Sequence, residues 1–87
     1  MKRDAEFFEG REATLVYIAK RLSNALALES VLTAAGVDYA VEADHYRGGF
    51  LFQTERIGAF FYVAAEAEQA ARDLMRTKGY KPYEAGR

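Results

Sequence analysis

His45 is the residue of this chain whose chemistry is easiest to specify. It is the one histidine in 87 residues, and it lies between Asp44 and Tyr46 just ahead of two glycines. A loop imidazole beside a carboxylate has the properties of a general base or of a metal ligand. A metal would have to collect Asp44, Glu42 or Glu55, because the chain has no second histidine and no cysteine. The alternative is a solvated or locally hydrogen-bonded loop residue.

Arginines flank the same pair of glycines. Arg47 precedes Gly48 and Gly49, and Arg56 follows them. Backbone amides together with two guanidinium groups are suited to hold a small anion such as phosphate or a carboxylate. The segment has neither the Gly-Lys-Ser/Thr of a phosphate loop nor the glycine spacing of a dinucleotide loop, so a turn bounded by solvated arginines is the alternative. The predicted ligand site comprises His45, Arg47, Gly48, Gly49 and Arg56.

The remaining polar residues show no catalytic pattern. The carboxylates between Glu42 and Glu68 have no spacing that would pair them as in a glycosidase. Ser23 and Ser30 lack the context of a nucleophile elbow, and Ser23 or Asn24 is better explained as the cap of a helix. We therefore assign no catalytic residue, no metal and no cofactor.

Composition and charge exclude several classes of function. Twelve Lys and Arg against 13 Asp and Glu give a net charge of -1, without the basic footprint of a nucleic-acid-binding protein. The absence of cysteine excludes a disulfide framework and a thiolate zinc site. Charges interrupt the first dozen residues and no apolar run is long enough to span a membrane, so we expect no signal peptide, no membrane contact and a cytoplasmic location.

The apolar periodicity predicts the order strand, helix, strand, strand, helix, strand. The first and third strands are apolar on both alternating faces, which is typical of central strands. The second strand has one apolar face, and Pro82 confines the last one to an edge. Residues 44–57 fit no single element. The predicted strands are 13–19, 37–42, 58–63 and 80–83, and the predicted helices are 25–35 and 66–78.

This order is that of a ferredoxin-like α+β domain. Such a fold, βαββαβ, has a four-stranded antiparallel sheet with two helices on one face and with the first and third strands at the centre. The predicted domain comprises residues 13–83. An N-terminal extension, residues 1–12, precedes it and a short tail, residues 84–87, follows it.

Two segments resemble a known family. Residues 25–40, ALALESVLTAAGVDYA, resemble the helix-to-strand signature of a family of small bacterial signal-transducing proteins of unknown biochemical function, which are compared with PII nitrogen regulators. Residues 63–75, VAAEAEQAARDLM, are similar to the second signature of that family. Leu26, Glu29 and Ala67 depart from its usual charged residues. The resemblance implies a ferredoxin-like fold with a regulatory or interaction role, and it supplies no catalytic residues.

Six Phe and six Tyr predict an apolar sheet face that the helices leave open. Strict alternation places Leu15 and Tyr17 on that face, opposite Val16 and Ile18, together with one alternating set of the third strand. Such a face needs a cover, which is a second subunit, the chain's own N-terminal and loop segments, or an apolar ligand. A two-fold homodimer is the expected solution. The predicted interface residues are Leu15, Tyr17, Phe60 and Tyr62.

Two classes of function follow. The first is a small non-enzymatic regulatory or protein-interaction domain, whose partner is a second copy or another protein, or which senses a small anionic ligand at Arg47 and Arg56. The second is a small dimeric enzyme of the monooxygenase or isomerase type. Its apolar pocket would lie between sheet and helices and would use His45, Tyr17 or Tyr62 as the polar group.

Overall fold

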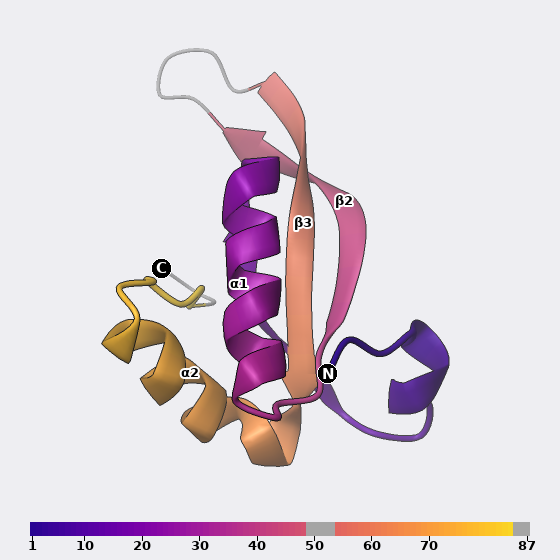
Figure 1. Ribbon diagram of the computed structural model, residues 1–87. Coiled ribbons are helices and arrows are strands. Elements are labelled where there is room, and N and C mark those ends of the chain that lie inside the picture. Colours follow the sequence, from indigo (N-terminus) through magenta and orange to yellow (C-terminus); the bar gives the residue numbers. More distant parts are fainter. Residues whose placement is uncertain (49–53, 85–87) are drawn as a thin grey trace.

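An antiparallel sheet carries two helices on one face in a computed structural model that describes residues 1–48 and 54–84 (Figure 1). Neither helix is long and apolar enough to cross a membrane. The described elements are the 3-10 helices η1 (Ala5–Phe8) and η2 (Ala65–Ala67), the strands β1 (Ala13–Ala19), β2 (Ala40–Gly48) and β3 (Thr54–Ala64), and the helices α1 (Leu22–Ala34) and α2 (Glu68–Thr77).

The sheet has three strands in the order β1-β3-β2. The predictions that the third strand is central and the second lies at an edge are confirmed. Residues 80–83 form no strand, so the predicted four-stranded sheet is not shown and β1 is an edge strand of this sheet. Pro82 has no N–H to donate, whereas the N–H of Tyr83 donates to the carbonyl of Val16 at 2.7 Å. The C-terminal segment therefore lies beside β1 through a single backbone hydrogen bond.

A β-bulge interrupts β1. The register shifts between Leu15 and Tyr17, so that Val16 is an extra residue of this strand. Val16 is fully buried, and the Tyr17 ring contacts Phe61 in the same core. Ile18 consequently faces away from the helices. The expectation that Tyr17 lies on the open face and Ile18 under the helices is therefore wrong, because strict alternation does not survive a bulge.

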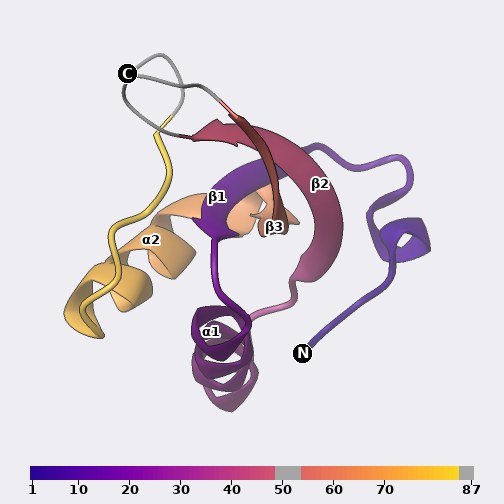
Figure 2. The ribbon, with the colours of Figure 1, turned by 90° about the horizontal axis from the view of Figure 1, so that it is seen from above.

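The core fills the space between the sheet and the helices. Figure 2 shows both helices on one side of the curved sheet. The Tyr39 hydroxyl is hydrogen-bonded to the Thr33 hydroxyl at 2.9 Å and donates to the Glu29 carbonyl at 3.2 Å, which ties the start of β2 to α1. The buried core residues are Val16, Ala19, Ala25, Leu28, Leu32, Tyr39, Phe61, Val63, Ala71 and Met75.

The two helices begin differently from the predictions. The N-cap residue of α1 is Arg21, whose side chain makes no capping hydrogen bond, so neither Ser23 nor Asn24 is the cap. Gly36 follows α1 with a φ of 75°, which confirms the predicted helix stop. η2 precedes α2, which therefore starts at Glu68 rather than at Glu66.

The N-terminal segment covers one end of the open face and lies along β2. Phe8 is buried against Ala40 and Ala64, which lie near the paired ends of β2 and β3. Lys2 forms an isolated parallel bridge with Tyr39 at the start of β2. The N-terminal extension is therefore one of the covers that the sequence predicted, at this end of the sheet.

Two leucines of α1 test the assignment of its buried side. Leu32 is fully buried and Leu26 is 54% exposed, although both lie in the same helix. We expect Leu32→Ala to lower the free energy of unfolding by about 2–5 kcal/mol, because it removes core contacts and leaves a cavity. Leu26→Ala should change it by about 0.5 kcal/mol or less. Urea unfolding of both variants measures the difference, and equal costs would contradict the buried side described above.

Candidate functional site

The open face of the sheet is hollowed beside β1. A depression of about 470 Å³ has Leu15, Ile18 and Phe60 as its apolar floor. Tyr46 borders it from β2, and Tyr83 borders it from the C-terminal segment. We call this depression the open-face hollow. Its floor lies on the opposite side of the sheet from the core, and Tyr17 and His45 also border it.

Gly58 allows the Tyr46 ring to lie across β3. A Cβ at Gly58 would be 2.9 Å from Cε1 of Tyr46 and 3.1 Å from the carbonyl oxygen of Ala19. The ammonium of Lys20 lies 5.5 Å from the centroid of the same ring, a cation–π contact. β2 therefore contacts β1 over the glycine, and the aromatic ring closes one end of the open-face hollow.

Opposite charges lie on opposite sides of the open face. Glu42 pairs with Phe60 and Asp44 pairs with Gly58, so both carboxylates belong to the open face of β2. Burial raises the pKa of the Tyr62 hydroxyl, and the charges of Glu42 and then Asp44 raise this pKa further. Lys20 directly follows β1, on the opposite edge of the sheet from β2. The open face is therefore acidic along β2 and basic at the end of β1.

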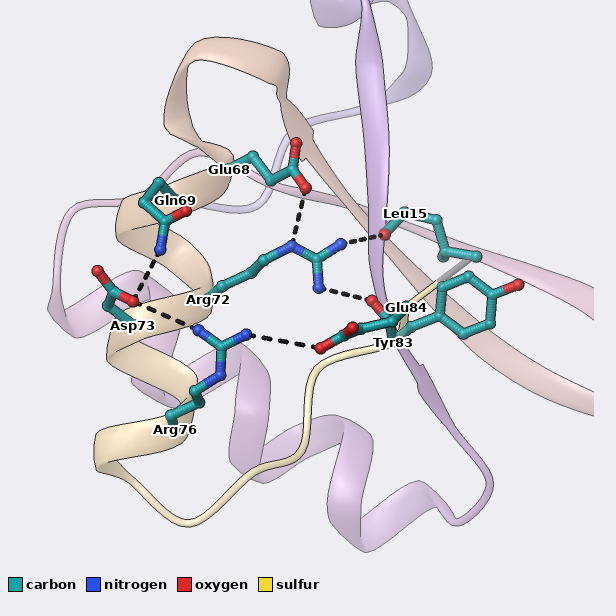
Figure 3. Close-up of polar contacts among 8 residues, drawn as sticks. All are labelled: Leu15, Glu68, Gln69, Arg72, Asp73, Arg76, Tyr83 and Glu84. Atoms are coloured by element: carbon teal, nitrogen blue, oxygen red, sulfur yellow. Dashed lines mark hydrogen bonds and ion pairs between the residues drawn. The ribbon is translucent and has the colours of Figure 1, made fainter. Parts of the chain in front are cut away.

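Arg72 fixes the C-terminal segment against β1 (Figure 3). Its Nε donates to Glu68 at 2.8 Å, Nη1 to the Tyr83 carbonyl at 2.6 Å, and Nη2 to the Leu15 carbonyl at 3.5 Å. The Arg72 side chain is only 12% exposed. One planar guanidinium thus joins α2, β1 and the C-terminal segment, which positions Tyr83 as a wall of the open-face hollow.

Of the predicted ligand site, the structure describes the side chains of His45 and Arg56. His45 pairs with Ile57 and Arg56 pairs with Tyr46, so the two basic residues belong to opposite faces of the hairpin. The backbone N–H of His45 donates to the carboxylate of Asp44 at 2.7 Å. His45 also borders the open-face hollow. β2 ends with Arg47 and Gly48, and the side chain of Arg47 is not described. Gly49 lies outside the described residues.

Three of the four predicted interface residues share one face. Leu15, Phe60 and Tyr62 lie on the open face, whereas the Tyr17 ring packs against Phe61 and also against Tyr80, with centroids 5.6 Å apart. Burial raises the pKa of the Tyr17 hydroxyl, with a smaller contribution from Tyr80.

Sequence reasoning missed Ile18, Lys20 and Tyr46 as residues of the open face. Of these three, only Tyr46 had a signal in the sequence. Gly58 lies at the start of the predicted apolar strand, and a glycine there indicates that another group approaches the backbone closely. No residue type in 13–19 marks the bulge that places Ile18 and Lys20.

The polar residues of the enzyme interpretation are not gathered in one pocket between sheet and helices. Tyr17 and His45 both border the open-face hollow, which is not enclosed under the helices, and Tyr62 lies on the open face outside its lining. The space under the helices holds fully buried side chains, including Leu28 and Met75. Within residues 1–48 and 54–84, no three His, Asp or Glu side chains are grouped to hold a metal ion.

Comparisons with protein-family models, with curated proteins and with solved structures find no match to this chain. The resemblance to the small bacterial signal-transducing proteins therefore stays a prediction. Function has to be inferred from the geometry of the chain itself.

Two arginines of α2 test how the C-terminal segment is held. Arg76 contacts Asp73 at 3.4 Å and Glu84 at 3.7 Å, but its side chain is 48% exposed. We expect Arg72→Ala to lower the free energy of unfolding by about 1–3 kcal/mol, because it leaves carbonyl groups unpaired. Arg76→Ala should change it by about 0.5 kcal/mol or less.

The amide of Tyr83 reports on the same question locally. Its N–H is bonded to Val16, so its hydrogen exchange should accelerate in Arg72→Ala and stay unchanged in Arg76→Ala. Equal exchange rates in both variants would show that Arg72 does not hold the segment.

Proposed function

We propose that this protein is a small non-enzymatic interaction domain of regulatory type, which pairs with a second copy through the open face of its sheet. The observation that carries the proposal is the composition of this face. Leu15, Ile18 and Tyr62 are partly exposed around the buried Phe60, and opposite charges lie on either side of them. An apolar strip between complementary charges is the arrangement expected of a self-complementary interface.

The strand order determines how two copies fit. A two-fold axis parallel to the strands places β1 of one copy over β2 of the other and β3 over β3, with the sheets about 10 Å apart. Ile18, Phe60 and Glu42 lie at one level of the sheet. β1 and β2 run in the same direction, because both are antiparallel to β3. Asp44, two residues after Glu42, therefore lies at the level of Lys20, two residues after Ile18. In this orientation Lys20 of each copy faces Asp44 of the other, so the pairing forms twice.

A different axis does not bring these charges together. A two-fold axis perpendicular to the strands places β1 over β1, and Lys20 then faces the opposite end of that strand. The Lys20–Asp44 pairing therefore distinguishes the two orientations. Phe8 covers only the end of the open face near Ala40, at the far end of β2 from Asp44.

The open-face hollow favours a second candidate function, the sensing of a small apolar anion. Its floor is apolar, while Lys20 and Lys81 line it. An aromatic carboxylate or a similar ligand matches this combination. Such a ligand would occupy the surface that the proposed dimer buries, so the two functions predict different masses in native mass spectrometry.

Charge reversal tests the dimer. Native mass spectrometry of the unaltered chain should give a dimer mass without an adduct. Lys20→Glu and Asp44→Lys should each raise the dissociation constant about tenfold or more, because each variant places two pairs of like charges in contact. Mixing the two variants should give a heterodimer, since both of its pairs are then opposite in charge. The double variant should dimerise again.

Melting temperatures of the variants serve as the control, because both residues are exposed and the fold should be retained. A monomeric unaltered chain would refute the dimer. A dimer insensitive to both reversals would refute this face or this axis. A reproducible adduct on a monomer would favour the sensing of a small anion instead.

A further inference from the structure

The outward side of α1 lacks the charge that surface helices carry. Its sequence, LSNALALESVLTA, contains one charged residue, Glu29. Leu22 and Leu26 lie one turn apart and are 75% and 54% exposed. α2, in contrast, is clearly amphipathic and turns charged residues to solvent. The exposed side of α1 therefore combines neutral polar residues, such as Ser23 and Ser30, with two leucines, and this pairing of exposed leucines is what requires an explanation.

A groove continues this apolar surface onto the sheet. The β2–β3 hairpin projects beyond the first turn of α1 (Figure 1). Val41 and Ala43 of β2 lie there beside Ile57 of β3, which is 66% exposed. Together with Leu22 they line a depression of about 290 Å³ that is mostly apolar. We call it the α1 groove. It lies on the helix side of the sheet, away from the open-face hollow.

The charged residues that line the α1 groove are basic. They are Lys20 and Arg21, and no carboxylate borders it among the described residues. The ammonium of Lys20 contacts the Tyr46 ring on the other face, which leaves Arg21 as the lining cation available to an occupant. Within residues 1–48 and 54–84, Arg21 takes part in none of the ion pairs given by the structure.

We infer that the α1 groove binds an acidic amphipathic segment of a partner protein. Its apolar side chains would lie against Leu22 and Ile57, and its carboxylates would lie beside Arg21. A second copy fits this surface less well than an acidic segment, because a two-fold contact centred on Arg21 would bring two guanidinium groups together. The inference goes beyond the dimer and does not rest on it, since Lys20 is the one described residue that lines both surfaces.

Two designed helical peptides test the inference. Both carry leucines at helical spacing, and they differ only in having Glu or Lys at the flanking positions. Fluorescence anisotropy with the intact protein should give a dissociation constant at least about tenfold lower for the Glu peptide. Leu22→Glu and Ile57→Glu, which alter different elements, should each weaken its binding about tenfold or more. Arg21→Glu should remove the preference for the Glu peptide.

Ala70→Glu is the matched control, because it adds the same charge at an exposed position of α2. It should leave the binding of the Glu peptide unchanged. Asp44→Lys should also leave it unchanged, so that failure of the dimer is distinguishable from failure of this site. The inference is overturned if neither peptide binds or if the Lys peptide binds as well. It is also overturned if Leu22→Glu dissociates a dimer that Asp44→Lys leaves intact, since a second copy would then occupy the groove.

Discussion

The β-bulge at Val16 decides which side of the sheet each later residue of β1 faces. Because the strand carries one extra residue, Tyr17 joins Val16 under the helices, and Ile18 and Lys20 turn to the open face. In a regular strand, Lys20 would project on the helix side. The floor of the open-face hollow, the contact of Lys20 with Tyr46 and the basic end of the open face all depend on this local irregularity.

Much of the architecture was predictable because hydrophobic periodicity reports burial directly. The two-sided apolar pattern of 58–63 identified the central strand, and Gly36 identified the end of α1. The fourth strand was not predictable in the same way. Residues 80–83 were expected to form a short strand. Pro82 has no backbone N–H to donate, and the Arg72 guanidinium donates to the carbonyls of Leu15 and Tyr83, which strand pairing would otherwise use. Tertiary contacts of a single side chain therefore override a local pattern.

The candidate surfaces were less predictable than the fold, because they depend on contacts between residues distant in sequence. Alternation predicted Leu15 on the open face, but it did not decide which alternating set of the third strand joins it. The approach of Tyr46 over Gly58 likewise requires the register of the hairpin. Leu22 is an apolar residue on the exposed side of α1. Its significance emerges only when Ile57 is found beside the same helix, since a lone exposed leucine is ordinary.

Each free edge of the sheet is blocked at one point. Lys2 and its neighbours lie along the start of β2, and on the other side the guanidinium of Arg72 reaches the backbone of β1. A guanidinium offers donors and no acceptor, so a further strand finds no reciprocal ladder at that point. Exposed strand edges otherwise promote growth of sheets from chain to chain. At these two points, growth of the sheet by a further strand is therefore disfavoured.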